Sequence, residues 1–317
     1  MTTDFVMRPI YDTLLRGTTE TPIGIYHLPL ITAEQLCRLH YRPGSINAVK
    51  ARLKTLVDEG YLQADAIPSK RLRSPYYYTL GTKGMKYLED LGLERHPAWR
   101  AGKEVEKGAL FVEHTLELND VLISAALLHR ADARYHLHSF LHERALRRQP
   151  YKATWRQAGQ SQTFTIIPDA FLDLRLRLPT GRYRRWPLLL EHDRGTEGQQ
   201  HFKQRIRAYI TLFKSEMYCD LFGVQTLSVV FTTFLGAERV EEMRVWTRQE
   251  LEATNESVEI GTLFFFSALP RPISPAELWL GQVWRLTYDE YSDLQSLFGE
   301  SVSQRMTILD AVANATA

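Results

Sequence analysis

The tripeptide Arg42-Pro43-Gly44 constrains the N-terminal fold more than any other feature of the sequence. Proline and glycine in tandem end a helix and make a tight turn, so the segments on either side must be separate elements. Thr32 and Gln35 form a capping box that begins the first segment. The second segment has the apolar spacing of a helix with one buried face, at Ile46, Val49, Leu53, Leu56 and Val57. The pattern predicts two short helices joined by a turn.

Two predicted strands and a final helix follow. Tyr61-Leu62 starts the first strand and Tyr76 to Leu80 forms the second, with the basic tip Lys70 to Arg73 between them. Gly81 and Gly84 open the last predicted helix. The order of helix, turn, helix, hairpin and helix resembles the winged-helix families of bacterial regulators, which often close with a similar Tyr-x-Leu-x-x-x-Gly stretch, here Tyr78 to Gly84.

Cationic and amide side chains fall mainly on the side of the second helix away from its apolar residues. Such a helix can enter the major groove while a hairpin contacts phosphates. We expect double-stranded DNA as the partner, contacted by Asn47, Lys50, Arg52, Lys54, Lys70, Arg71 and Arg73. The alternative is that the same module serves protein contact or dimerisation.

Charge is unevenly distributed along the chain. From Arg38 to Lys86 there are ten Lys or Arg residues against three acids, whereas from Gly236 to the end there are six Arg against thirteen acids. A basic front suggests a face that meets a polyanion, although ordinary solvated faces would give the same count. Two distant cysteines fit a reducing compartment, and no apolar run is long enough for a bilayer. We therefore expect a cytoplasmic protein.

The elements predict an α+β chain. A winged helix-turn-helix domain covers residues 1–95, a polar and basic linker 96–110, and an α/β domain with a mixed central sheet flanked by helices 111–317. That second domain would begin with a long helix at 111–129 and continue with strands at 134–140, 163–178 and 186–191. A helix at 198–217, a strand at 227–234, a helix at 238–253 and a strand at 263–266 would follow. Gly181 suits a hairpin turn between the second and third strands.

Two resemblances rest on the acids of this domain. Pro168-Asp169 and Glu191-His192-Asp193 resemble the restriction-endonuclease-like, PD-(D/E)xK fold, except that Asp193 stands where that pattern has lysine. Over most of the chain, and above all in the string Leu190 to Glu197, the sequence is similar to the replication-relaxation family of plasmids and other mobile elements, which is related to conjugative relaxases. This resemblance implies a DNA-binding protein of replication or mobilisation that nicks or relaxes DNA.

The acids suggest a metal-dependent nuclease site. Phosphodiester hydrolysis uses a metal to activate water, and Mg²⁺ prefers oxygen ligands. Asp169, Glu191 and Asp193, on neighbouring strands, would hold Mg²⁺ or Mn²⁺, and Lys203 would replace the missing lysine as a fourth catalytic residue. Accessory candidates are His114, Glu143, Arg194 and Tyr209. The alternative is a tight turn at a strand end in a non-catalytic regulator with a degenerate nuclease fold.

A rival metal site is the pair His136 and His138 on one strand face, with Tyr209 as a nominal nucleophile, in the manner of another relaxase type. No phosphate loop or zinc-spaced Cys/His set is present, which disfavours ATP hydrolysis and zinc binding. A homodimer is compatible with the sequence.

Overall fold

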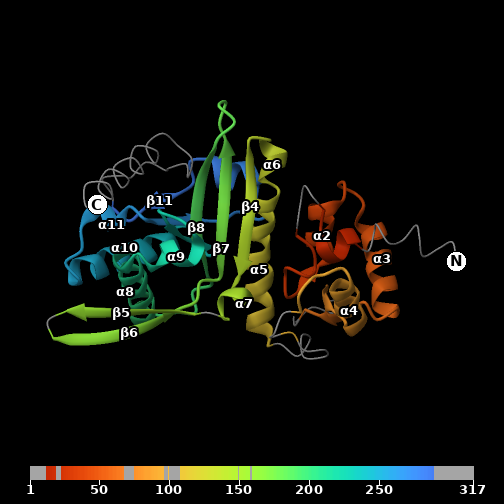
Figure 1. Ribbon diagram of the computed structural model, residues 1–317, viewed down its shortest axis with the longest axis horizontal. Helices are drawn as coiled ribbons and strands as arrows, with labels where there is room; N and C mark the ends of the chain where they lie inside the picture. Colours follow the sequence, from red (N-terminus) through yellow and green to blue (C-terminus); the bar gives the residue numbers. More distant parts are fainter. Residues whose placement is uncertain are drawn as a thin grey trace. The chain divides into compact units, whose positions relative to one another are not determined.

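The computed structural model describes residues 12–18, 23–67, 75–95, 99, 108–148, 150–157 and 159–288. The contacts divide the chain into two compact units, residues 1–127 and 128–317. The long helix that the sequence suggested as the start of the second domain, α5 (Ala109–Ala126), groups with the first unit by its contacts. The expected α+β class is confirmed, with helices and mixed sheets in one chain (Figure 1).

In its described residues the first unit has a short helical stretch at 12–16, then two helices, a β-hairpin and two further helices, with a small antiparallel sheet. The sheet has the order β1-β3-β2. The elements are β1 (Ile31–Thr32), α2 (Ala33–His40), α3 (Ile46–Asp58), β2 (Leu62–Ala66), β3 (Tyr76–Leu80), α4 (Thr82–Asp90) and α5.

Local sequence explains the start of this unit. The capping box is confirmed, since the Thr32 hydroxyl accepts the Gln35 amide at 3.2 Å and the Gln35 side chain accepts the Thr32 amide at 3.1 Å. Ser45 stands at the N-cap of α3, but its side chain makes no capping hydrogen bond there. The predicted apolar stripe of α3 is buried at Val49, Leu53 and Leu56.

Helix α5 is tied to the first helices by polar contacts. The Asn119 side chain donates to the Leu30 carbonyl at 2.6 Å, and the Gln35 side chain donates to the Leu116 carbonyl at 2.8 Å. Arg38 forms an ion pair with Asp120 at 2.8 Å. These bonds, together with apolar packing, explain why α5 belongs to this unit.

The second unit is built on a mixed six-stranded sheet with the order β11-β10-β9-β8-β7-β4. β8, β9 and β10 run parallel and the other neighbours antiparallel. Its strands are β4 (Tyr135–His142), β5 (Tyr151–Gln157), β6 (Gln160–Ile166), β7 (Ala170–Arg177), β8 (Tyr183–Asp193), β9 (Ser228–Thr233), β10 (Phe264–Ala268) and β11 (Arg285–Leu286). Its helices are α6 (Leu128–Ala131), α7 (Glu143–Leu146), α8 (Gln199–Ser215), α9 (Met217–Phe222), α10 (Ala237–Ala253), α11 (Val258–Gly261) and α12 (Pro275–Leu280).

Helices α8 and α10 contact each other and pack on one face of the sheet. Phe202, Ile206 and Tyr209 of α8 and Met243 of α10 are buried in one core with Phe231 of β9 and other sheet residues. The side chains with 3.6-residue spacing on these helices therefore meet the alternate side chains of the strands, as the sequence predicted for 198–217.

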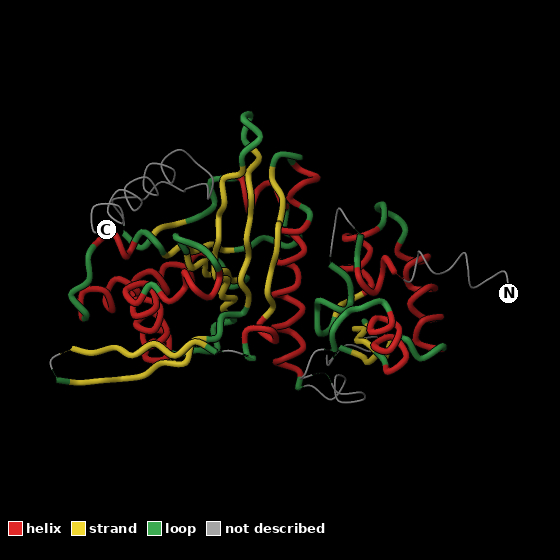
Figure 2. The backbone as a smooth tube through the Cα atoms, viewed as in Figure 1, coloured by secondary structure: helices red, strands yellow, loops and turns green. Residues whose placement is uncertain are grey.

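The prediction of one strand over 163–178 is wrong. Pro168, which cannot donate to a sheet ladder, and Asp169 separate β6 from β7. β6 pairs with β5, which the sequence analysis missed, in a two-stranded sheet of its own, and Figure 2 shows this hairpin as a long arm. The alternation of Tyr151, Ala153 and Trp155 with polar residues was the signal for β5.

In the part of the chain that the structure describes, no helix combines the length and apolar character that crossing a bilayer requires.

Candidate functional site: an acid cluster held by arginines

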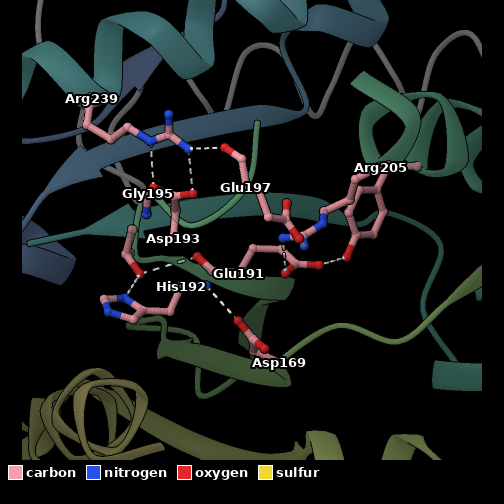
Figure 3. A network of polar contacts seen from close by, with 10 residues as sticks. Asp169, Glu191, His192, Asp193, Gly195, Glu197, Arg205 and Arg239 are labelled. Carbon is pink, nitrogen blue, oxygen red and sulfur yellow. Dashed lines mark hydrogen bonds and ion pairs between the residues drawn. The ribbon is translucent and has the colours of Figure 1, made fainter. Parts of the chain in front are cut away.

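The acids predicted from the sequence lie at one end of β7 and β8. Asp169 directly precedes β7, and the register pairs Ala170 with Leu190. The Asp169 carboxylate accepts the backbone amide of His192 at 2.7 Å. The structure therefore brings Asp169 next to the segment that carries Glu191 and Asp193 (Figure 3).

Glu191 is buried and bound by two side chains from α8. Arg205 donates to one carboxylate oxygen at 3.0 Å, and the Tyr209 hydroxyl donates to the other. Burial raises the pKa of Glu191 to about 7, the Arg205 charge opposes the shift, and the nearby Asp169 charge adds to it. Burial and the adjoining Glu191 carboxylate also raise the pKa of Tyr209 well above its ordinary value, so this hydroxyl keeps its proton.

Asp193 is paired in a bidentate manner with an arginine of α10. Arg239 donates from Nε at 2.7 Å and from Nη2 at 2.9 Å, and the Gly195 amide adds a bond of 3.0 Å. Both side chains are buried, with 9% exposure for Arg239 and 5% for Asp193. The guanidinium also lies 4.8 Å from the centre of the Trp246 ring. This is the geometry of a strong structural ion pair.

Glu197 connects the two arginines. Its carboxylate contacts Arg205, and its backbone carbonyl accepts Arg239 at 3.2 Å. His192 is bound separately: its ring shares a hydrogen bond of 3.0 Å with Thr232, whose hydroxyl donates to the Glu191 carbonyl at 3.3 Å. The last residues of β8 and the segment that follows them are thus fixed by α8, α10 and β9 together (Figure 3).

Of the remaining predicted site residues, Tyr209 joins the cluster through its contact with Glu191. Within the described residues, no hydrogen bond or ion pair joins Lys203 to these acids. The cation of the same helix that contacts Glu191 is Arg205. Glu143 donates its backbone amide to the Asp169 carbonyl at 2.7 Å, but its carboxylate contacts Arg147. Arg194 follows β8 and is half-buried.

His114 lies in α5, in the first unit. The sequence analysis missed Arg205 and Arg239. Arg205 could have been found, because it lies four residues before Tyr209 and so shares its helix face. Arg239 is 46 residues from Asp193, and no local pattern points to it.

In this arrangement the carboxylates of Glu191 and Asp193 are bound by protein donors. Every carboxylate oxygen of Glu191 and Asp193 accepts a hydrogen bond, and among the described residues no three His, Cys, Asp or Glu side chains are grouped to hold a metal ion. The rival metal pair predicted from the sequence, His136 and His138, lies on β4 with 6.3 Å between the two ring centres. β4 has a bulge between Leu137 and Ser139, so the strand is irregular at this pair.

The predicted DNA-contact residues of α3 form an exposed polar face. Asn47, Lys50 and Lys54 are exposed, and the lysines make ion pairs with Glu34 at 3.1 Å and Asp58 at 2.5 Å. Arg52 is half-buried, with its guanidinium 5.1 Å from the Tyr41 ring centre. Lys70, Arg71 and Arg73 lie outside the described residues.

The fold and the cluster define an α+β protein in which a unit of helices and a small antiparallel sheet precedes a mixed-sheet unit with ion-paired acids. The chain belongs to the replication-relaxation family, whose model matches residues 24–227. This membership suggests a part in the replication of plasmids or other mobile elements. No curated protein and no solved structure matches the chain significantly.

Proposed function

We propose that the protein binds double-stranded DNA during replication of a plasmid or mobile element, with the first unit acting as a winged helix. One observation carries the proposal: α3, the second helix of a helix-turn-helix, presents Asn47, Lys50 and Lys54 to solvent on the side opposite its buried residues. In winged helices, the second helix of this motif enters the major groove.

The ion pairs of this face leave it available to phosphate. The Lys50 and Lys54 side chains are 53% and 75% exposed. Ion pairs between exposed side chains contribute about 0–1 kcal/mol, so DNA phosphates can replace the partner acids at small cost. Binding of this kind releases counterions and weakens steeply with salt.

The test is duplex binding by the full chain, measured by fluorescence anisotropy on DNA from the replicon that encodes it. We expect Lys50→Glu with Lys54→Glu to weaken binding at least tenfold and to reduce the slope of log affinity against log salt by about 1.8, since each lost phosphate contact removes about 0.9. The control pair, Lys152→Glu with Arg156→Glu, changes exposed cations of β5. Equal binding by the two double variants would contradict the proposal.

In this proposal the second unit has a restriction-endonuclease-like fold whose acids are structural. The argument is the bidentate contact of Arg239 with Asp193 and the contact of Arg205 with Glu191. Breaking a buried ion pair costs about 3–5 kcal/mol, so these arginines hold the strand end firmly in place.

Metal-dependent DNA nicking is the second candidate function. It is favoured by the placement of Asp169 against the His192 amide, which puts acids of two neighbouring strands at one sheet end. Supercoiled plasmid carrying the cognate origin should then become open circular with Mg²⁺ or Mn²⁺, and Asp169→Ala should abolish this while retaining the circular dichroism of the parent. If the unmodified protein nicks no plasmid with either ion, this candidate is rejected.

A further inference from the structure

Arginines collect on the β7–β8 hairpin at the end away from the acid cluster. The register places Arg175 opposite Arg185 and Arg177 opposite Tyr183. Residues directly opposite in an antiparallel pair, and residues two apart along a strand, share a face of the sheet. Figure 1 shows the turn of this hairpin projecting beyond the neighbouring strands. Arg182 belongs to this turn, where its carbonyl accepts the Leu178 amide at 2.8 Å.

We call this surface the arginine face, and it consists of Arg175, Arg177, Tyr183 and Arg185, the adjacent His136 of β4, and Arg182 in the turn that ends the hairpin. The register of β4 on β7 pairs His136 with Arg175. The surface therefore spans three neighbouring strands.

Acids on the same surface do not balance its positive charge. The buried carboxylate of Asp173 binds both Arg175, at 2.9 Å, and Arg185, at 3.1 Å. Arg177 and Arg182 are exposed, and no ion pair joins either of them to an acid in the part of the chain that is described. The four arginines thus share one acid, and a positive charge excess faces the solvent.

Aromatic rings lie among these cations. Tyr183 is 49% exposed, and its ring packs edge-on against His136 with 5.3 Å between the ring centres. The pKa of His136 is lowered, first by burial and then by the positive charges of His138 and Arg175, while Asp173 opposes the shift.

We propose that the arginine face binds the phosphodiester backbone of single-stranded DNA, with the Tyr183 ring stacking on an unpaired base. The choice of DNA as the polyanion rests on the function proposed above. The exposed ring beside guanidinium groups favours a single strand, because base faces are accessible to stacking only when the bases are unpaired. Loss of base pairing accompanies the start of replication, where such a surface would hold the released strand.

The test is binding of a fluorescein-labelled 30-residue oligothymidylate by the full chain across a salt series. Arg177→Glu with Arg182→Glu should weaken binding at least tenfold and reduce the salt slope by about 1.4, since each phosphate contact on a single strand contributes about 0.7. Tyr183→Ala should weaken binding about fivefold or more, whereas Tyr183→Phe should keep it, because stacking needs the ring alone. The control pair Lys152→Glu with Arg156→Glu should bind like the parent.

The two proposals fail in different ways. Equal oligothymidylate binding by the Arg177/Arg182 variant and the control pair would overturn the inference, and duplex binding through α3 would stand. Equal losses of duplex and oligothymidylate in that variant would overturn the single-strand assignment. If the parent protein binds oligothymidylate through these arginines but binds no duplex, the inference holds and the function proposed for α3 fails. Circular dichroism of each variant verifies that the fold is retained.

Discussion

Arg239 is the residue on which the arrangement around Asp193 depends most. It makes two hydrogen bonds to one buried carboxylate and a third to the Glu197 carbonyl. Lysine cannot reproduce this geometry, because an ammonium group lacks the planar fork that matches two carboxylate oxygens.

Arg239→Ala should therefore lower the free energy of unfolding of the second unit by about 3 kcal/mol, because it leaves the Asp193 charge buried without its cation. Arg239→Lys should recover only part of the loss. Urea denaturation measures both, with Arg148→Ala as the control, since Arg148 is an exposed arginine of the same unit. A change of about 0.5 kcal/mol or less, the size of an ordinary surface substitution, would show that the pair is not structural.

Glu191 makes stability depend on pH. Its pKa rises from 4.5 to about 7 in the folded protein, mainly through burial. The folded state then binds the proton more tightly than the unfolded state. The stability that the protonated Glu191 side chain adds to the folded state is complete below pH 4.5 and falls as the pH rises toward 7. Above about pH 7 this contribution is lost, and the titration of Glu191 changes stability no further. The shift in pKa corresponds to a change of about 3 kcal/mol in the free energy of unfolding.

Glu191→Gln should flatten the stability profile between pH 4.5 and 7, because glutamine has no proton to lose in that window. Chemical denaturation at a series of pH values gives the profile, and Glu238→Gln, at an exposed position of α10, is the control. A variant with the slope of the parent over this window would contradict the assignment of the shift to Glu191.

At the scale of elements, a close approach of backbones fixes α4 against the loop before β2. A Cβ atom added at Gly84 would lie 2.2 Å from the Tyr61 carbonyl oxygen. Neither side can give way easily, because the conflicting atom belongs to the backbone.

Gly84→Ala should therefore destabilise the first unit by about 1–3 kcal/mol, the usual cost of overpacking. Gly108→Ala is the matched control, since a Cβ there meets nothing within 4 Å. The measurement is thermal or urea unfolding of both variants. An equal effect of the two substitutions would refute a steric role for Gly84.

Elements with strong periodicity could be predicted from the sequence, and each wrong prediction of an element has a physical cause. α8 was found because its apolar stripe repeats at the helical period. β6 and β7 were merged because apolar residues continue on both sides of Pro168. The acids of the cluster were found from the resemblance of Pro168-Asp169 and Glu191-His192-Asp193 to a nuclease pattern, whereas their cations come from helices later in the chain. Pairing across such separations depends on tertiary structure, which local pattern does not encode.

At the scale of the whole molecule, the division of contacts at residues 127 and 128 implies two cores. Units with separate cores unfold separately when the interactions between them are weak. Gly84→Ala should then reduce hydrogen-exchange protection in residues 23–127 alone, and Arg239→Ala in residues 128–288 alone. Loss of protection in both units with either variant would show that the chain unfolds as one cooperative body.

The β5–β6 arm forms a sheet of its own, so its hydrogen-bond ladder is independent of the six-stranded sheet. Residues inserted or deleted at its outer turn would alter the reach of the arm without shifting the register of any other strand. Among relatives, insertions and deletions in this part of the chain should therefore occur mainly at that turn. The hydrogen bonds of the six-stranded sheet that carries the acids would stay the same, while the surface that the β5–β6 arm can contact would differ from one relative to the next.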